Sequence, residues 1–306
     1  MLAVAACFAL ASAQALNETT PKLQVVVASD VTADLAGFVG GPSVDVVRVG
    51  GLDGDPHHAE PTPADAAKVV RAGLVIVFGL GLDADLQKMH STTGSTAGLL
   101  VMADGLGRAG ESCDHPDHGH SHADHDHTAS GIDPHAWHDP IKVITMTDRV
   151  QHAPSERRPA DAAAFKGRAD ALRSKLRELD GWTRAEVAKI PANRRTVVTT
   201  HQALGHWGER YGIRVIGVEM TGNEVDTSPT RIIELVASVR AAGAPVIFGD
   251  ATHRSRTAEV VARESGTRLV ETLRFDGLSP AAEAGGSAYV ATMRGNTESI
   301  VKALQP

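Results

Sequence analysis

Histidine side chains crowd into one short segment of this 306-residue chain. Six of them lie within thirteen residues and alternate with aspartate and small residues: His115, His118, His120, His122, His125 and His127. Such a segment has almost nothing apolar to bury in a core, whereas imidazole is a common ligand of Zn, Cu and Ni ions. The composition therefore predicts a metal-binding loop over residues 113–128.

Two plainer explanations of this segment are an expression tag and a passive solvated loop. A tag would lie at a terminus and would not alternate with aspartate, so the sequence disfavours it. A passive loop stays as an alternative. Cys113 begins the segment, and its thiol is a further candidate metal ligand.

The first fifteen residues form an apolar run that ends in Ala13-Gln14-Ala15, a small-x-small cleavage site. This pattern predicts a signal peptide over residues 1–15 and a periplasmic protein. The stretch Val4-Ala5-Ala6-Cys7 resembles a lipobox, but the apolar run continues past Cys7, so a lipid anchor there is the less favoured alternative. After cleavage Cys113 would be the only cysteine, which excludes an internal disulfide.

Strand and helix patterns alternate along both halves of the chain, which predicts an α/β fold of parallel strands with right-handed crossovers. Each half is expected to contain four strands, the first four over residues 22–29, 44–49, 74–78 and 99–103, and the second four over residues 196–200, 214–218, 246–250 and 268–273. Helices are expected between them. The region from 105 to 131 has no such periodicity, and structureless segments of this length are usually functional or disordered.

A long amphipathic helix is expected between the two halves. Apolar residues recur there at steps of four, three, four and three, which defines one helical stripe: Phe165, Ala169, Leu172, Leu176 and Leu179. The predicted organisation is thus an N-terminal lobe (16–158), a rigid linker helix (159–190) and a C-terminal lobe (191–306). Each lobe would be a four-stranded parallel sheet flanked by helices.

Four candidate ligands follow predicted strands. Open parallel sheets bind ligands beyond the carboxyl ends of their strands, and the candidates stand at such positions: His57, His135, His201 and Asp276. Three imidazoles and one carboxylate make a complete tetrahedral set for Zn²⁺. Spacing alone is a weak signal, because a lone loop histidine is more often a solvated side chain.

Local motifs around these residues resemble the metal-specific solute-binding proteins of ABC importers for zinc and manganese, known as cluster A-I. The similar motifs are Asp55-Pro-His-His-Ala-Glu-Pro-Thr-Pro63, Gly79-Leu-Gly-Leu82, Asp133-Pro-His-Ala-Trp-His-Asp-Pro140, His201-Gln-Ala-Leu-Gly-His-Trp-Gly-Glu-Arg-Tyr-Gly212 and Ala288-Tyr-Val-Ala-Thr-Met-Arg-Gly-Asn296. They extend over nearly the full chain, and together they are specific.

The resemblance implies two α/β lobes, a linking helix and one metal ion held between the lobes by His57, His135, His201 and Asp276. Manganese relatives often carry glutamate at the third ligand position, so His201 points to zinc. Zinc relatives often carry a His/Asp-rich loop where this chain has one, and the chain resembles the ZnuA and AztC subgroups of the family. The implied partners are a membrane permease of an ABC transporter and a periplasmic zinc metallochaperone. A monomer is expected.

Several residues depart from the family pattern or leave the ligand set open. His58 adjoins His57, and only the register of the motif selects His57. His138 stands where the family motif has an aliphatic residue, so it is either an added outer ligand or a surface group. A disulfide found in the C-terminal lobe of many zinc relatives cannot form here. The remaining histidines are expected to be structural or solvated: His90, His152, His206 and His253.

Other classes of function fit the sequence less well. A catalytic zinc usually keeps one position open for water, whereas four protein ligands close the site, and the common hydrolase and nucleotide-binding motifs are absent. The net charge of −7 argues against nucleic acid as a partner. A periplasmic zinc buffer or adhesin without a transporter, and a manganese-binding protein, remain as alternatives.

Overall fold

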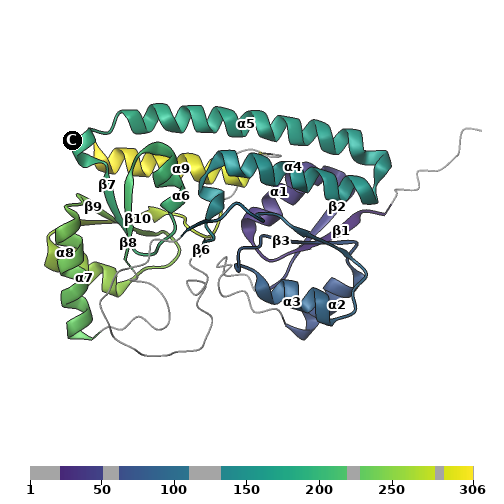
Figure 1. Cartoon of the computed structure of the whole chain (residues 1–306), viewed down its shortest axis with the longest axis horizontal. Helices are drawn as coiled ribbons and strands as arrows, with labels where there is room; N and C mark the ends of the chain where they lie inside the picture. The colour runs from purple at the N-terminus through teal and green to yellow at the C-terminus, as the bar shows by residue number, and fades with distance from the viewer. Residues whose placement is uncertain (1–20, 51–61, 110–131, 219–227, 280–285, 306) are drawn as a thin grey trace, which may run out of the picture.

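Two four-stranded parallel sheets form the framework of the computed structural model, which describes residues 21–50, 62–109, 132–218, 228–279 and 286–305 (Figure 1). The N-terminal sheet has the order β2-β1-β3-β4, with strands β1 (Leu23–Val27), β2 (Val44–Arg48), β3 (Leu74–Val77) and β4 (Gly98–Val101). The C-terminal sheet has the order β10-β9-β7-β8, with strands β7 (Thr196–Thr199), β8 (Arg214–Gly217), β9 (Val246–Asp250) and β10 (Arg268–Leu273). Both sheets therefore follow the same order, in which the first strand of each unit pairs with its second and third.

The predicted α/β class is confirmed, and the eight expected strands lie within two residues of their predicted bounds. Helices connect the strands and flank the sheets: α1 (Asp30–Gly40), α2 (Pro63–Arg71), α3 (Ala84–Thr92), α6 (Gly205–Tyr211), α7 (Pro229–Ala242) and α8 (Arg256–Ser265). Ser29, Thr62, Ser228 and Ser255 cap four of these helices, because each side-chain oxygen accepts a hydrogen bond from a backbone N–H of the first turn.

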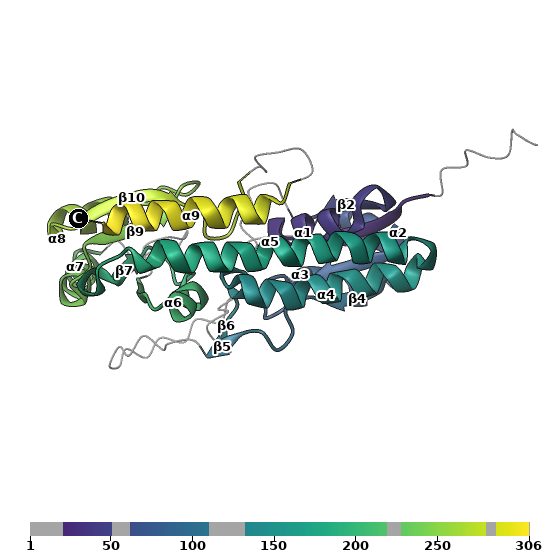
Figure 2. The same ribbon diagram turned by 90° about the horizontal axis from the view of Figure 1, so that it is seen from above.

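Three further helices lie on one side of the two sheets: α4 (Pro140–Arg157), α5 (Ala162–Ala188) and α9 (Ala288–Leu304). The helix α5 runs along both halves, whereas α4 lies over the N-terminal half and α9 over the C-terminal half (Figures 1 and 2). The long helix α5 packs against α1 and α4 from the N-terminal half and against α9 from the C-terminal half. The predicted apolar stripe from Phe165 to Leu179 is fully buried in these contacts. At the other end of the helix, the Arg294 guanidinium lies 4.6 Å above the ring of Trp182.

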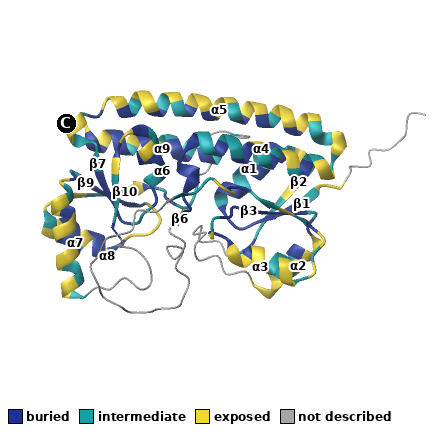
Figure 3. Cartoon of the chain, viewed as in Figure 1, coloured by how far each residue is buried: buried dark blue, intermediate teal, exposed yellow. Residues whose placement is uncertain are grey.

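The main hydrophobic core is continuous between the two sheets. One cluster of buried side chains reaches from Val25 in β1, through the stripe of α5, to Val246 in β9. Figure 3 shows α5 accordingly as a helix with one buried and one exposed face. The stripe on α5 thus ties both sheets to one helix.

A short antiparallel pair was not predicted. Strands β5 (Arg108–Ala109) and β6 (Ile132–Asp133) pair with each other and bring the two ends of segment 110–131 together. A pair of two-residue strands offers no periodicity from which to recognise it. The pair positions Asp133, two residues before the candidate ligand His135.

Candidate metal centre

Three of the four predicted ligands lie together between the two sheets. His135 follows β6, His201 follows β7 at the carboxyl edge of the C-terminal sheet, and Asp276 follows β10. One ligand atom from each lies within 4.8 Å of the others. The fourth predicted ligand, His57, and its neighbour His58 lie outside the described residues, as do Cys7, the segments 1–15 and 113–128, and Cys113.

The distances in this cluster fit a single ion. The His135 Nε2 and His201 Nε2 atoms are 3.1 Å apart. The same His135 nitrogen lies 3.7 Å from Asp276 Oδ1, whereas the other ring nitrogen of His201, Nδ1, lies 3.7 Å from Asp276 Oδ2. Zinc binds histidine nitrogen at about 2.0–2.1 Å, which places two tetrahedral ligands roughly 3.3 Å apart. His135 is buried, and the side chains of His201 and Asp276 are only 20% and 15% exposed.

Asp133 fixes the orientation of His135. Its Oδ1 atom accepts hydrogen bonds from His135 Nδ1–H at 2.8 Å and from the backbone N–H of the same residue at 3.0 Å. Burial alone would raise the pKa of Asp133, but the hydrogen bond from His135 and the nearby imidazoles of His135 and His206 lower it to about 2. With a hydrogen atom on Nδ1, the lone pair of His135 Nε2 faces the cluster, as in other carboxylate–histidine–metal arrangements.

No role was predicted for Asp133 from the sequence, although an aspartate two residues before a ligand histidine is a usable signal. The Arg108 Nη1 atom lies 3.4 Å from its second oxygen. Gly205, at the start of α6, permits this approach, because a Cβ atom there would lie 2.6 Å from the same oxygen. The carboxylate is therefore held on both sides.

His206 has a structural place beside the site, as expected. It is buried, and its Nδ1 atom accepts a hydrogen bond from Lys142 Nζ at 2.8 Å. Its Nε2 atom donates to the Asp133 carbonyl oxygen at 3.2 Å. Burial lowers the pKa of His206, so the neutral ring bridges α4 to the segment that carries His135.

The expectation that His138 is a surface group or an added ligand is wrong. The residue is 1% exposed, and its Nε2 atom donates to the Phe275 carbonyl oxygen at 2.9 Å. Burial, and then the proximity of His135, lower its pKa to about 3. The imidazole is therefore neutral and serves as a hydrogen-bond donor within the protein. The burial of His138 could not be predicted from the spacing of apolar residues in the sequence.

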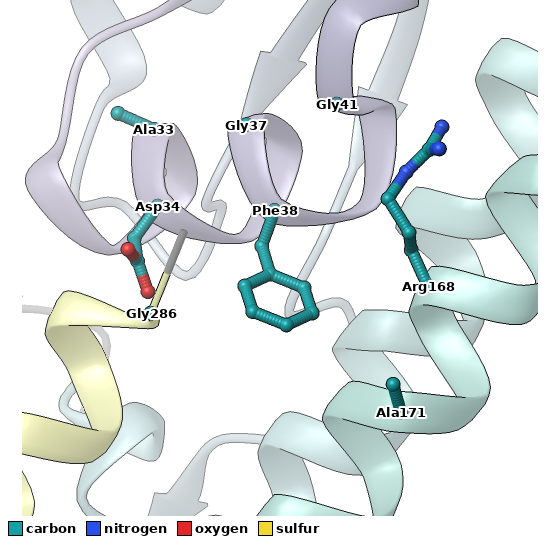
Figure 4. Close-up of a pocket in the computed structure, with 8 residues that line it drawn as sticks. All are labelled: Ala33, Asp34, Gly37, Phe38, Gly41, Arg168, Ala171 and Gly286. Atoms are coloured by element: carbon teal, nitrogen blue, oxygen red, sulfur yellow. The ribbon is translucent and has the colours of Figure 1, made fainter. Parts of the chain in front are cut away.

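A cavity of about 480 Å³ lies away from the cluster, between α1 and α5 (Figure 4). Phe38 lines it together with two charged residues that already have partners in the protein. Asp34 accepts hydrogen bonds from Ser287 and from the first backbone N–H groups of α9, and Arg168 donates to the carbonyl oxygens at the end of α1. Both charged groups among the described lining residues are therefore already engaged within the protein.

Two parallel β-sheets are flanked by helices, and a cluster of two imidazoles and one carboxylate lies between the sheets. Together these features define a two-lobed metal-binding protein. A family model described as "Zinc-uptake complex component A periplasmic" (ZnuA) matches residues 25–303, so the chain belongs to this family. It is a periplasmic metal-binding component of an ABC importer, a class of substrate-binding proteins rather than enzymes. Within the described part of the chain, no helix is both long and apolar enough to span a membrane.

Curated relatives bear the names of different metals. A manganese-binding lipoprotein, MntA, of Halalkalibacterium halodurans is 25% identical over 288 residues, which cover 94% of this chain and 90% of the relative. A zinc-binding protein, AdcA, of Streptococcus pyogenes is 26% identical over 257 residues, which cover 80% of this chain and 49% of the relative. An iron-binding protein, YfeA, of Yersinia pestis is 25% identical over 289 residues, which cover 91% and 87%. These relatives are thus named for three different metals: manganese, zinc and iron.

Solved structures agree in fold. The periplasmic zinc binding protein TroA of Treponema pallidum has a TM-score of 0.76 at 22% identity, with 94% of this chain and 100% of that chain covered. A manganese-bound periplasmic metal binding protein of Candidatus Liberibacter asiaticus has a TM-score of 0.76 at 21% identity, with 92% and 100% covered. The two-sheet architecture therefore occurs in proteins described with either metal.

Proposed function

We propose that this protein captures one Zn²⁺ ion between its two lobes and delivers it to the permease of an ABC importer. The ligands are His57, His135, His201 and Asp276. The observation that carries the proposal is the convergence of two imidazoles and one carboxylate within 4.8 Å. His57 completes the set on the strength of its motif.

Zinc is favoured over manganese by the donor atoms. Nitrogen-rich, four-coordinate sites suit Zn²⁺, whereas Mn²⁺ prefers oxygen ligands and six-coordination. Manganese is the second candidate, because the relative MntA, which matches most of the chain, is named for manganese. The two candidates share the same ligands and differ in selectivity.

The deciding experiment is a metal analysis of the untagged protein purified from cells, followed by a competition titration with Zn²⁺ and Mn²⁺. We expect one tightly bound Zn²⁺ ion per chain and a strong preference for zinc. Comparable binding of Mn²⁺ would instead support manganese import, and no tight binding of either ion would contradict the site itself.

The remaining features of the proposal follow from the sequence. Residues 1–15 direct export, lobes 16–158 and 191–306 flank the linker 159–190, and the protein acts as a monomer in the periplasm. The segment 113–128 binds additional zinc weakly and passes it to the cleft, and a periplasmic zinc metallochaperone is a further proposed partner. Zinc uptake by cells that lack this gene separates import from the alternative of a zinc buffer or adhesin, because only an importer component would change the uptake rate.

A further inference from the structure

The backbone of Phe275, directly before the ligand Asp276, is held from both halves of the molecule. Its carbonyl oxygen accepts hydrogen bonds from Trp137 Nε1–H at 3.1 Å and from His138 Nε2–H at 2.9 Å. Its N–H donates to Asp250 Oδ2, at the end of β9, at 2.8 Å. The backbone that carries Asp276 is therefore fixed by the C-terminal sheet on one side and by the turn after His135 on the other.

The turn that supplies the two donors is itself rigid. Ala136–His138 form a single 3₁₀ turn directly after His135, and the His138 N–H donates to the His135 carbonyl oxygen at 3.1 Å. The Tyr289 hydroxyl, from α9, donates to the Trp137 carbonyl oxygen at 2.7 Å. One metal ligand and the donors that restrain the segment of another thus belong to one short, buried turn.

The Nε2 atom of His138 can act only as a donor at this position, whereas the buried Nδ1 atom has no hydrogen-bond partner among the described residues. The partner of Nε2 is a carbonyl oxygen, so this atom must carry the hydrogen atom. Nothing accessible competes for this bond, because the ring is fully buried. In such a site, a hydrogen bond between neutral groups orients the backbone and costs no buried charge.

We propose that His138 is a positioning residue of the metal site, which holds the Phe275 carbonyl and thereby keeps the Asp276 carboxylate opposite His135. This inference rests on the proposed function, because it requires Asp276 to be a ligand. Without the bond, the segment that carries Asp276 is less ordered in the metal-free protein, so binding of the ion must also order this segment. Metal affinity then falls and the ion dissociates faster.

The test compares two substitutions of His138 that differ in one donor. His138→Leu removes the hydrogen bond, whereas His138→Gln retains an N–H donor at a similar reach. His90→Leu is the matched control, because His90 Nε2 also bonds a backbone carbonyl, that of Ala97, at 2.9 Å, outside the metal cluster. Zinc affinity is measured by competition with a chromophoric chelator, and the coordination geometry is followed by the visible spectrum of the Co²⁺-loaded protein.

We expect His138→Leu to weaken zinc binding about three- to tenfold, the usual effect of one lost neutral hydrogen bond, and to alter the cobalt spectrum. His138→Gln should recover most of the affinity, and His90→Leu should bind as the wild type does. If the leucine variant does not fold, Trp137→Phe, which removes the other donor to the same carbonyl, replaces it with the same expectation.

Three results would overturn the inference: wild-type affinity and spectrum in His138→Leu, an equal loss in His90→Leu, or no recovery in His138→Gln. An Asp276→Asn variant separates this inference from the proposed function. If that variant binds zinc as tightly as the wild type, the ligand assignment fails; if it binds weakly while His138→Leu is normal, only the positioning role fails.

Discussion

Two histidines three residues apart have opposite roles because their hydrogen-bond partners differ. His135 donates a hydrogen bond from Nδ1–H to Asp133, and the lone pair of its Nε2 atom faces the cluster. His138 donates a hydrogen bond from Nε2–H to the Phe275 carbonyl oxygen. The partner thus determines which imidazole is available to a metal ion.

Loss of either imidazole of the cluster should weaken zinc binding by orders of magnitude. His135→Ala and His201→Ala each exchange a nitrogen ligand for water, so we expect a fall of at least about a hundredfold in a chelator competition assay. His152→Ala is the control, because that residue of α4 is exposed. Wild-type affinity in either site variant would contradict the ligand assignment.

Selectivity should depend on the donor atom at position 201. His201→Glu replaces nitrogen by a harder oxygen donor, which lowers the affinity for Zn²⁺ and favours Mn²⁺. We therefore expect the ratio of the two affinities to shrink relative to the wild type when both ions are titrated in the same buffer. An unchanged ratio would show that the selectivity arises elsewhere.

His138 should also make the stability of the metal-free protein depend on pH. Its pKa is about 3 in the folded chain and about 6.5 in an unfolded one. Between these values the unfolded chain binds the extra proton, so the free energy of unfolding falls as the pH falls. The contribution lost from pH 7 to pH 5 is about 2 kcal/mol.

Buried Asp83 acts in the opposite direction over part of this range, because burial raises its pKa to about 6. The wild type must therefore be compared with His138→Leu, in which the contribution of Asp83 is unchanged. Urea unfolding at pH 7 and pH 5 should show the wild type losing about 2 kcal/mol more than the variant. Equal losses in the two proteins would contradict the prediction.

At the scale of secondary structure, the sequence predicted strands and helices correctly wherever apolar residues recur at a regular spacing. The bounds of β9 and β10 match the predicted ones, and the stripe from Phe165 to Leu179 placed α5 correctly. The pair β5–β6 and the burial of His138 were missed because they depend on partners distant in sequence, and a two-residue strand has no periodicity. Three candidate ligands could be named from the sequence because each lies beyond a predicted strand, whereas their mutual distances could not be predicted.

The pair β5–β6 bears on the histidine-rich segment 113–128, because it anchors the chain on both sides of that segment next to His135. Zinc bound weakly there would be at a high effective concentration near the cluster. Deletion of residues 113–128 should leave the tight site intact, remove the weaker sites and slow zinc loading from a protein-bound donor. Equal loading rates with and without the segment would reduce its role to buffering.

At the scale of the whole molecule, α5 limits how the lobes can move. The helix packs on α1 and α4 from one half and on α9 from the other, and one continuous core joins the two sheets. A wide opening would separate these buried contacts. Metal release should instead involve small shifts of the lobes and local movement of the loops that carry the ligands.

This arrangement leads to a joint prediction for stability and shape. Zinc bound at the proposed site would bridge residues from both halves of the folded protein. It should therefore raise the melting temperature, by a stabilisation of about 4 kcal/mol at a thousandfold excess over Kd. Small-angle scattering curves of the metal-free and zinc-loaded protein should nevertheless nearly coincide. The His135→Ala variant should lose most of the thermal shift, since it lacks one bridge of the site. A large change in the radius of gyration on zinc binding would mean that α5 bends or detaches, and the rigid-linker interpretation would then fail even if zinc is the bound metal.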